Sequence, residues 1–173
     1  VDITHYTIDR DYEIPPGYTL HIRRKQTLTI ADAVTLTNEG TISNEDSGTI
    51  DGNGTIENNE DLKSDNTNIK VQLNGQKIKY KVNFQTNYPI DDGTNSTEYL
   101  SETDALRPGE LTYTYYTLVE GWYDDREGGN QITKITGPMT LYAHWTENLI
   151  KTTASPATLE GTYATPLEPN ELY

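Results

Sequence analysis

The stretch GTISNEDSGTIDGNGTI occupies residues 40–56 and contains three copies of Gly-Thr-Ile. Each copy supplies a very short strand with one apolar side chain, and Asn, Asp, Gly and Ser between the copies are typical turn residues. Similar units precede this stretch, among them Thr27-Leu-Thr-Ile30. Alternation places Leu28 and Ile30 on one face and the threonines on the other. Because such short units cannot bury a face alone, they must stack on one another.

Residues 1–68 are therefore predicted to form a short right-handed β-solenoid, with a β-meander or small sandwich as the alternative. The repeated texture also resembles β-helical segments of bacterial surface proteins. About 60 residues supply two or three coils, too few for the catalytic cleft of a β-helical polysaccharide lyase. Asparagines are expected in the turns, since Asn tolerates left-handed backbone conformations. They are Asn38, Asn44, Asn53, Asn58 and Asn59.

Composition alone would allow disorder. Leu, Ile, Val and Phe make up 34 of 173 residues, and the formal net charge is −14. Chains with little apolar content and high charge often fail to fold. However, the 13 Tyr, the 2 Trp and the regular spacing of Ile and Leu indicate a folded, β-rich chain with small cores.

The acidic balance, 27 Asp and Glu against 13 Lys and Arg, argues against a nucleic-acid partner. The basic runs 23–25 and Lys77, Lys79 and Lys81 are interpreted as solvated strand faces. No apolar run approaches the roughly 18 residues that a membrane helix needs, so no membrane insertion is expected. Without Cys, disulfides and thiol chemistry are excluded. The absence of an initiating Met suggests a fragment of a longer precursor with neighbouring domains.

The middle of the chain is predicted to contain a linker and a hairpin. Residues 57–68 are polar and indicate a linker or long turn. Val71 and Leu73 alternate up to Asn74-Gly75, a pair that favours a type I′ hairpin turn leading to Ile78.

Longer strands and aromatic residues follow from Lys79 onward. Tyr80, Val82 and Phe84 alternate on one face of a predicted strand. Residues 97–106 fit a short helix that Pro108-Gly109 would end. Residues 111–115 alternate as a further strand.

Three elements carry a family resemblance. They are Val82-Asn-Phe84, Glu120-Gly-Trp-Tyr123 and Thr140-Leu-Tyr-Ala-His-Trp-Thr146. Together they resemble the internalin B-type repeat, also called the Listeria–Bacteroides repeat, over about residues 79–147. The resemblance implies a small β-grasp-like module of exported surface proteins, with spacer or interaction roles and no catalysis. The predicted organisation is thus mainly β: a solenoid-like part (1–68), the repeat (69–147) and an extended linker or tail (148–173).

No constellation of residues has catalytic spacing. His5, His21 and His144 lack metal-ligand spacing, no Ser lies in a nucleophile elbow, and His144 is expected to face solvent opposite Trp145. The pairs Asp91-Asp92 and Asp124-Asp125 lie beside Gly, where Asp commonly serves turns. They, Glu127 and the 46–51 turn offer oxygen ligands for Ca²⁺ but lack EF-hand spacing. We therefore expect no catalytic residue, no metal site and no cofactor.

Aromatic residues are the remaining candidates for a site. Phe84, Trp122, Leu141 and Trp145 are predicted core residues, because each Trp can bury about 200 Å². Tyr side chains give contact area at low entropy cost, so exposed ones would suit a protein- or glycan-binding patch. The candidates are Tyr113, Tyr115, Tyr116 and Tyr123.

Together these features predict a non-enzymatic, extracellular segment of a bacterial cell-surface or cell-wall protein. It would act as a stalk, spacer or adhesion module toward a host extracellular protein or glycan. The alternative is a glycan-binding accessory module of a secreted carbohydrate-active protein, which would require an exposed aromatic pair.

Overall fold

The computed structural model describes residues 4–89, 94–106 and 110–148, and within these ranges the fold is all β with no helix. Accordingly, no helix in this part of the chain is long and apolar enough to cross a membrane. The predictions for Asp91, Asp92, Pro108-Gly109 and the tail after Asn148 concern residues outside these described ranges.

Two complete coils open the chain. Each coil has three short strands, and each strand of the first coil pairs in parallel with its equivalent in the second. The first coil contains β1 (His5–Ile8), β2 (Tyr12–Ile14) and β3 (Thr19–Ile22). The second contains β4 (Thr27–Ile30), β5 (Thr35–Asn38) and β6 (Thr41–Asn44).

The third coil consists of β7 (Thr49–Asn58) and β8 (Asp61–Ser64). The two halves of β7 pair with β4 and β5, and the strand bends between them at Gly52, whose φ is +112°. A Cβ at Gly52 would collide with the carbonyl oxygen of Ile30, so only glycine fits this corner. With about three turns, the predicted β-solenoid is confirmed over the meander and the sandwich.

Apolar side chains form columns along the inside of the solenoid. Leu20, Ile42 and Leu62 occupy equivalent register positions in successive coils, and Ile42 and Leu62 are fully buried. The alternation seen in the sequence is confirmed, since β4, β5, β6 and β8 each bury every second residue. A few apolar residues therefore suffice, because each one packs between the coils before and after it.

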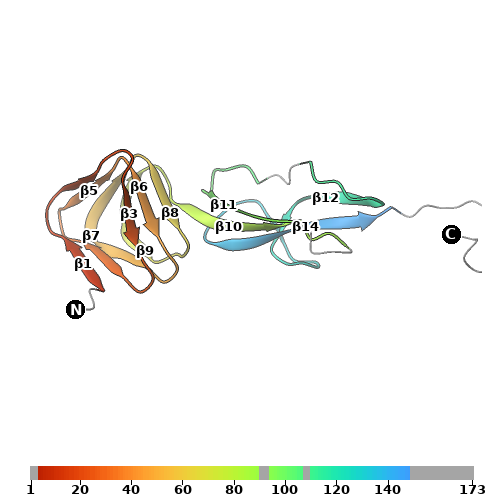
Figure 1. Cartoon of the computed structure of the whole chain (residues 1–173), viewed down its shortest axis with the longest axis horizontal. Coiled ribbons are helices and arrows are strands. Elements are labelled where there is room, and N and C mark those ends of the chain that lie inside the picture. The colour runs from red at the N-terminus through yellow and green to blue at the C-terminus, as the bar shows by residue number, and fades with distance from the viewer. Residues whose placement is uncertain (1–3, 90–93, 107–109, 149–173) are drawn as a thin grey trace, which may run out of the picture.

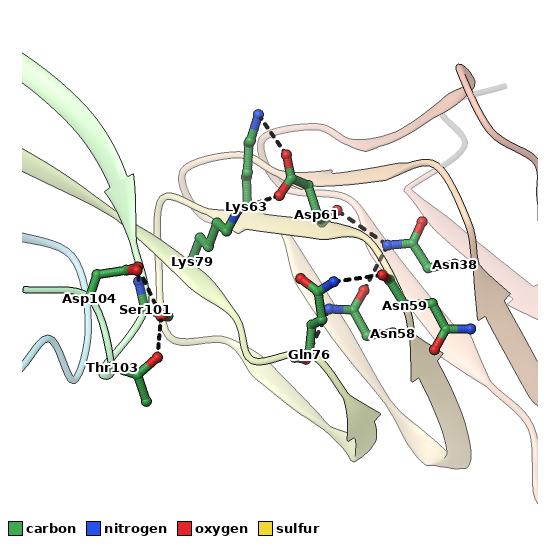
Figure 2. A network of polar contacts seen from close by, with 10 residues as sticks. All are labelled: Asn38, Asn58, Asn59, Asp61, Lys63, Gln76, Lys79, Ser101, Thr103 and Asp104. Carbon is green, nitrogen blue, oxygen red and sulfur yellow. Dashed lines mark hydrogen bonds and ion pairs between the residues drawn. The ribbon is translucent and has the colours of Figure 1, made fainter.

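Buried asparagines form a second column. Asn38 Nδ2 donates to Asn58 Oδ1 at 2.7 Å, and Asn58 Nδ2 donates to the Gln76 carbonyl at 3.0 Å, as Figure 2 shows. The expectation that Asn supplies left-handed turn residues is wrong in the described coils: apart from glycines, the residues with positive φ there are Lys25, Ala33 and Ser47. The side chains of Asn38 and Asn58 instead form hydrogen bonds with each other and with backbone groups of Gly40 and Gln76.

Two predictions for the middle of the chain are wrong. Residues 57–68 are not a linker, because β8 lies within them and buries Leu62 completely. The Asn74-Gly75 hairpin is absent because β9 (Ile69–Gly75) pairs in parallel with β7, while β10 (Lys79–Gln85) begins by pairing with β8. Gly75 does have a positive φ of +82°, but it serves a coil corner.

A second, mixed sheet follows the solenoid, and β10 belongs to both (Figure 1). Beyond Tyr80, β10 pairs in parallel with the last strand and along its other edge antiparallel with β11. The other strands are β11 (Asn95–Leu100), β12 (Tyr116–Tyr123), β13 (Gln131–Ile132) and β14 (Met139–Glu147). The sheet order is β11-β10-β14-β12-β13.

Two local predictions in this sheet are also wrong. Residues 97–106 do not form a helix: β11 extends to Leu100, where its pairing with β10 overrides local propensity. Residues 111–115 are not a strand, because a turn closed by the Tyr116 N–H donating to the Tyr113 carbonyl precedes β12.

The solenoid and the second sheet each have their own hydrophobic cluster. Tyr80, Val82 and Phe84 share one face of β10 as predicted, and all three lie in the second cluster. The buried members of the first cluster are Ile14, Ile22, Leu28, Ile30, Val34, Leu36, Ile42, Ile50, Ile56 and Leu62. Those of the second are Val82, Phe84, Trp122, Ile135, Leu141 and Ala143.

Replacing Ile56 with Ala should lower the free energy of unfolding by about 2–5 kcal/mol, because the side chain is fully buried and pairs with Leu36 and Leu73 in register. Urea unfolding measures this. The exposed Tyr18→Ala variant is the control and should change stability by less than about 0.5 kcal/mol. Equal effects of the two variants would contradict the stacked core.

Candidate functional site

The junction between the solenoid and the second sheet is built on one edge of β10. Lys79 and Tyr80 pair with Lys63 and Ser64 of β8, and residues 82–85 pair with residues 139–142 of β14. Tyr80 pairs with Leu100 of β11 on the opposite edge. Hence β14 follows β8 along the same edge of a single strand, and the two sheets are continuous.

Ion pairs reinforce this junction. Lys79 Nζ lies 2.5 Å from Asp61 Oδ1, and Lys63 Nζ lies 3.3 Å from Asp61 Oδ2 (Figure 2). Lys81 Nζ lies 3.4 Å from Asp65 Oδ2, and Lys77 pairs with Glu102 of the segment after β11. The three lysines of the 77–81 series are at least partly exposed, as expected for a solvated face, and each also pairs with a carboxylate.

Electrostatics follow from these contacts. The hydrogen bond from Lys79 is the main reason that the pKa of the Asp61 carboxyl is lowered. Burial, together with the hydrogen bond to Asp65, raises the pKa of Tyr99 to about 12. The Tyr99 hydroxyl donates to Asp65 Oδ1 at 2.7 Å, so a β11 side chain is tied to the loop after β8.

The four predicted core residues differ in burial. Phe84, Trp122 and Leu141 are buried, whereas Trp145 is partly buried against the same cluster. Phe84 and Trp122 have ring centroids 4.8 Å apart in a tilted arrangement. Trp145 Nε1 donates to the Thr86 carbonyl at 2.8 Å, which fixes its indole against the end of β10.

The structure does not bring the four candidate tyrosines together. Tyr116 and Tyr123 lie at opposite ends of β12, about 20 Å apart at the usual rise of a strand. Tyr113 stacks on Tyr88 at 4.6 Å and contacts Trp145 and Tyr116. Tyr115 is 63% exposed and has a φ of +67°, an uncommon value for an aromatic residue.

Tyr123 forms a separate pair with His144. Their rings stack 3.9 Å apart, and His144 Nε2 contacts the Asp125 carbonyl at 2.8 Å. His144 is therefore partly buried rather than simply solvent-facing.

The carboxylates of the acidic turns form hydrogen bonds and ion pairs with other groups of the protein. Asp124 Oδ1 accepts from the Asn130 N–H at 2.6 Å, and this bond is the main cause of the lowered pKa of Asp124. Asp51 accepts from Thr29 Oγ1, and Asp46 pairs with Arg24. Among the described residues no group of three or more His, Cys, Asp or Glu is placed to hold a metal ion.

Comparison with models of protein families, with curated proteins and with solved structures finds no match for this chain.

Sequence reasoning missed the junction. A usable signal exists: Lys79 and Lys81 follow Asp61 and Asp65 by 18 and 16 residues, close to the length of the last coil. Charges of opposite sign spaced by one coil stack on each other, which a search limited to neighbouring residues cannot detect.

Replacing Tyr99 with Phe should remove a pH-dependent part of the stability. A phenol whose pKa rises from 10 to about 12 on folding stabilises the folded state fully below pH 10, and this contribution is lost as the pH rises through 12. The wild type should therefore lose more stability than Tyr99→Phe between pH 10 and 12, as urea unfolding at each pH would measure. Tyr18→Phe is the exposed control, and parallel curves for wild type and Tyr99→Phe would refute the assignment.

Truncation of Trp145 to Ala should cost about 3–5 kcal/mol of unfolding free energy, toward the lower value because the side chain is half-buried. Trp145→Phe keeps an aromatic ring but loses the hydrogen bond to Thr86, so it should lower the free energy of unfolding by about 1 kcal/mol. Chemical denaturation gives both values. A Trp145→Ala protein as stable as the wild type would exclude a structural role.

Proposed function

We propose that this chain is a non-enzymatic, extracellular segment of a bacterial cell-surface protein that acts as a load-bearing stalk or spacer for adhesion. The observation that carries the proposal is the shared strand β10. It joins the last coil to the second sheet without an intervening linker.

The direction of the strands supports load bearing. In Figure 1 the solenoid and the second sheet lie end to end, and β10 and β14 run along the long axis. A pull between Thr4 and Asn148 draws β10 toward the solenoid and β14 away from it. Because these neighbouring strands are parallel, the pull loads all their hydrogen bonds together in shear. Solenoid coils, by contrast, contact mainly their neighbours and would peel away one at a time.

The surface location rests on the resemblance of residues 79–147 to the internalin B-type repeat. We infer a β-grasp-like module from the strand order, in which β10 and β14 form a parallel central pair and β11 and β12 flank them antiparallel. We also infer a right-handed solenoid, since parallel crossover connections are almost always right-handed. The net charge of −14 suits a soluble display arm.

A glycan-binding accessory module is the second candidate function. The exposed Tyr115, two residues after Tyr113 of the Tyr88–Tyr113 stack, favours it.

Single-molecule force spectroscopy tests the stalk. The chain has no native Cys, so handles can be attached at Thr4→Cys and Asn148→Cys. We expect low-force peeling of coils and one stronger event that releases roughly 200 Å of chain between Val82 and Tyr142. Moving the first handle to Pro89→Cys pulls the same two strands from their shared end and should unzip them at a much lower force. Equal forces in the two geometries would contradict the shear arrangement.

A further inference from the structure

A hollow of about 240 Å³ opens in the second sheet between β11 and the segment before β12. Its apolar floor includes Phe84, Trp122 and Leu111. Its other side includes the polar residues Thr94, Ser96 and Glu98. The volume is below the roughly 300 Å³ at which pockets for drug-sized ligands begin, so it suits a ligand of about one ring.

The polar side of the hollow is the inner face of β11. In the antiparallel register Ser96 lies opposite Phe84, and Glu98 lies opposite the fully buried Val82. Directly opposed residues point to the same side of a sheet. The core-facing side of β11 thus carries a hydroxyl and a carboxylate where packing alone would favour apolar residues, and both side chains stay exposed.

A buried donor borders the same hollow. Trp122 lines it and is 5% exposed, yet its Nε1–H has no hydrogen-bond partner among the residues that the structure describes. In the described part of the chain, Asn44 Oδ1 is the other buried side-chain polar atom in this state. An unpaired buried donor costs about 1–3 kcal/mol, and because Trp122 lines the hollow, a ligand there would change the surroundings of its indole.

We propose that this hollow binds a single neutral sugar unit of a glycan. An apolar floor suits the C–H face of a sugar ring, and the hydroxyls and the carboxylate suit its hydroxyl groups. Glu98 carries the one charge among the described lining residues, so acidic ligands would be repelled. The proposal rests on the glycan-binding candidate and places its site here rather than at Tyr115.

The two indole N–H groups of the chain give a direct readout, because the protein has only two Trp. In ¹H–¹⁵N spectra titrated with the methyl glycosides of glucose, galactose, mannose and N-acetylglucosamine, at least one sugar should shift the Trp122 indole signal saturably. The Trp145 signal should move less, since its Nε1 is bonded to Thr86. Trp122→Phe assigns the signals.

Substitutions locate the site. Ser96→Ala and Glu98→Ala, both at exposed positions, should weaken binding about three- to tenfold each, as expected for one lost hydrogen bond. Thr97→Ala on the opposite face of β11 is the matched control and should leave affinity unchanged. Binding that Tyr115→Ala abolishes and these variants spare would keep the glycan-binding function and overturn the hollow. A titration in which no sugar shifts the Trp122 signal would overturn the hollow as the site, and one in which no signal of any residue shifts would overturn the glycan-binding function as well.

Discussion

The parallel pairing of β10, first with β8 and then with β14, is the interaction on which the rest of the structure depends. A solenoid end is an open edge, and exposed edges invite association with other chains. Here the first residues of β10 pair with β8 and cover part of this edge. The rest of β10 then lies in the centre of the second sheet, between β11 and β14. Asp61 and Asp65 pair with Lys79 and Lys81 of β10 at this point, so charge adds to the backbone pairing at the junction.

This arrangement explains how a chain so poor in apolar residues folds. Within the solenoid the Ile and Leu side chains pack together in one cluster, and Asn38 and Asn58 form a side-chain hydrogen bond across coils. In the second sheet Trp122, Phe84 and Leu141 fill a small core around β10. Neither cluster is large. Because β10 pairs with both β8 and β14, the solenoid and the second sheet stabilise each other where they meet.

The solenoid was predictable because its signal is local and repeated: Leu28 and Ile30 alternate with Thr, and the pattern recurs at each coil. Where neighbours in sequence are not neighbours in space, prediction failed. Asn74-Gly75 fits a hairpin locally, but β9 and β10 pair with different strands of the preceding coil. Residues 57–68 are polar on average, yet they contain strand β8, in which Leu62 is the single apolar residue. The tyrosines of 113–123 are close in sequence, but β12 places Tyr116 and Tyr123 at its opposite ends. Ser96 and Glu98 gave no signal at all, since their position opposite Phe84 and Val82 depends on the register of β11.

The central claim is that β10 makes the solenoid and the second sheet one rigid body. Residual dipolar couplings of backbone amides in weakly aligned solution test it most directly. Couplings from β4–β8 and from β12–β14 should fit a single alignment tensor of the same magnitude and orientation. Two tensors of different magnitude would show that the units reorient independently and would contradict the account.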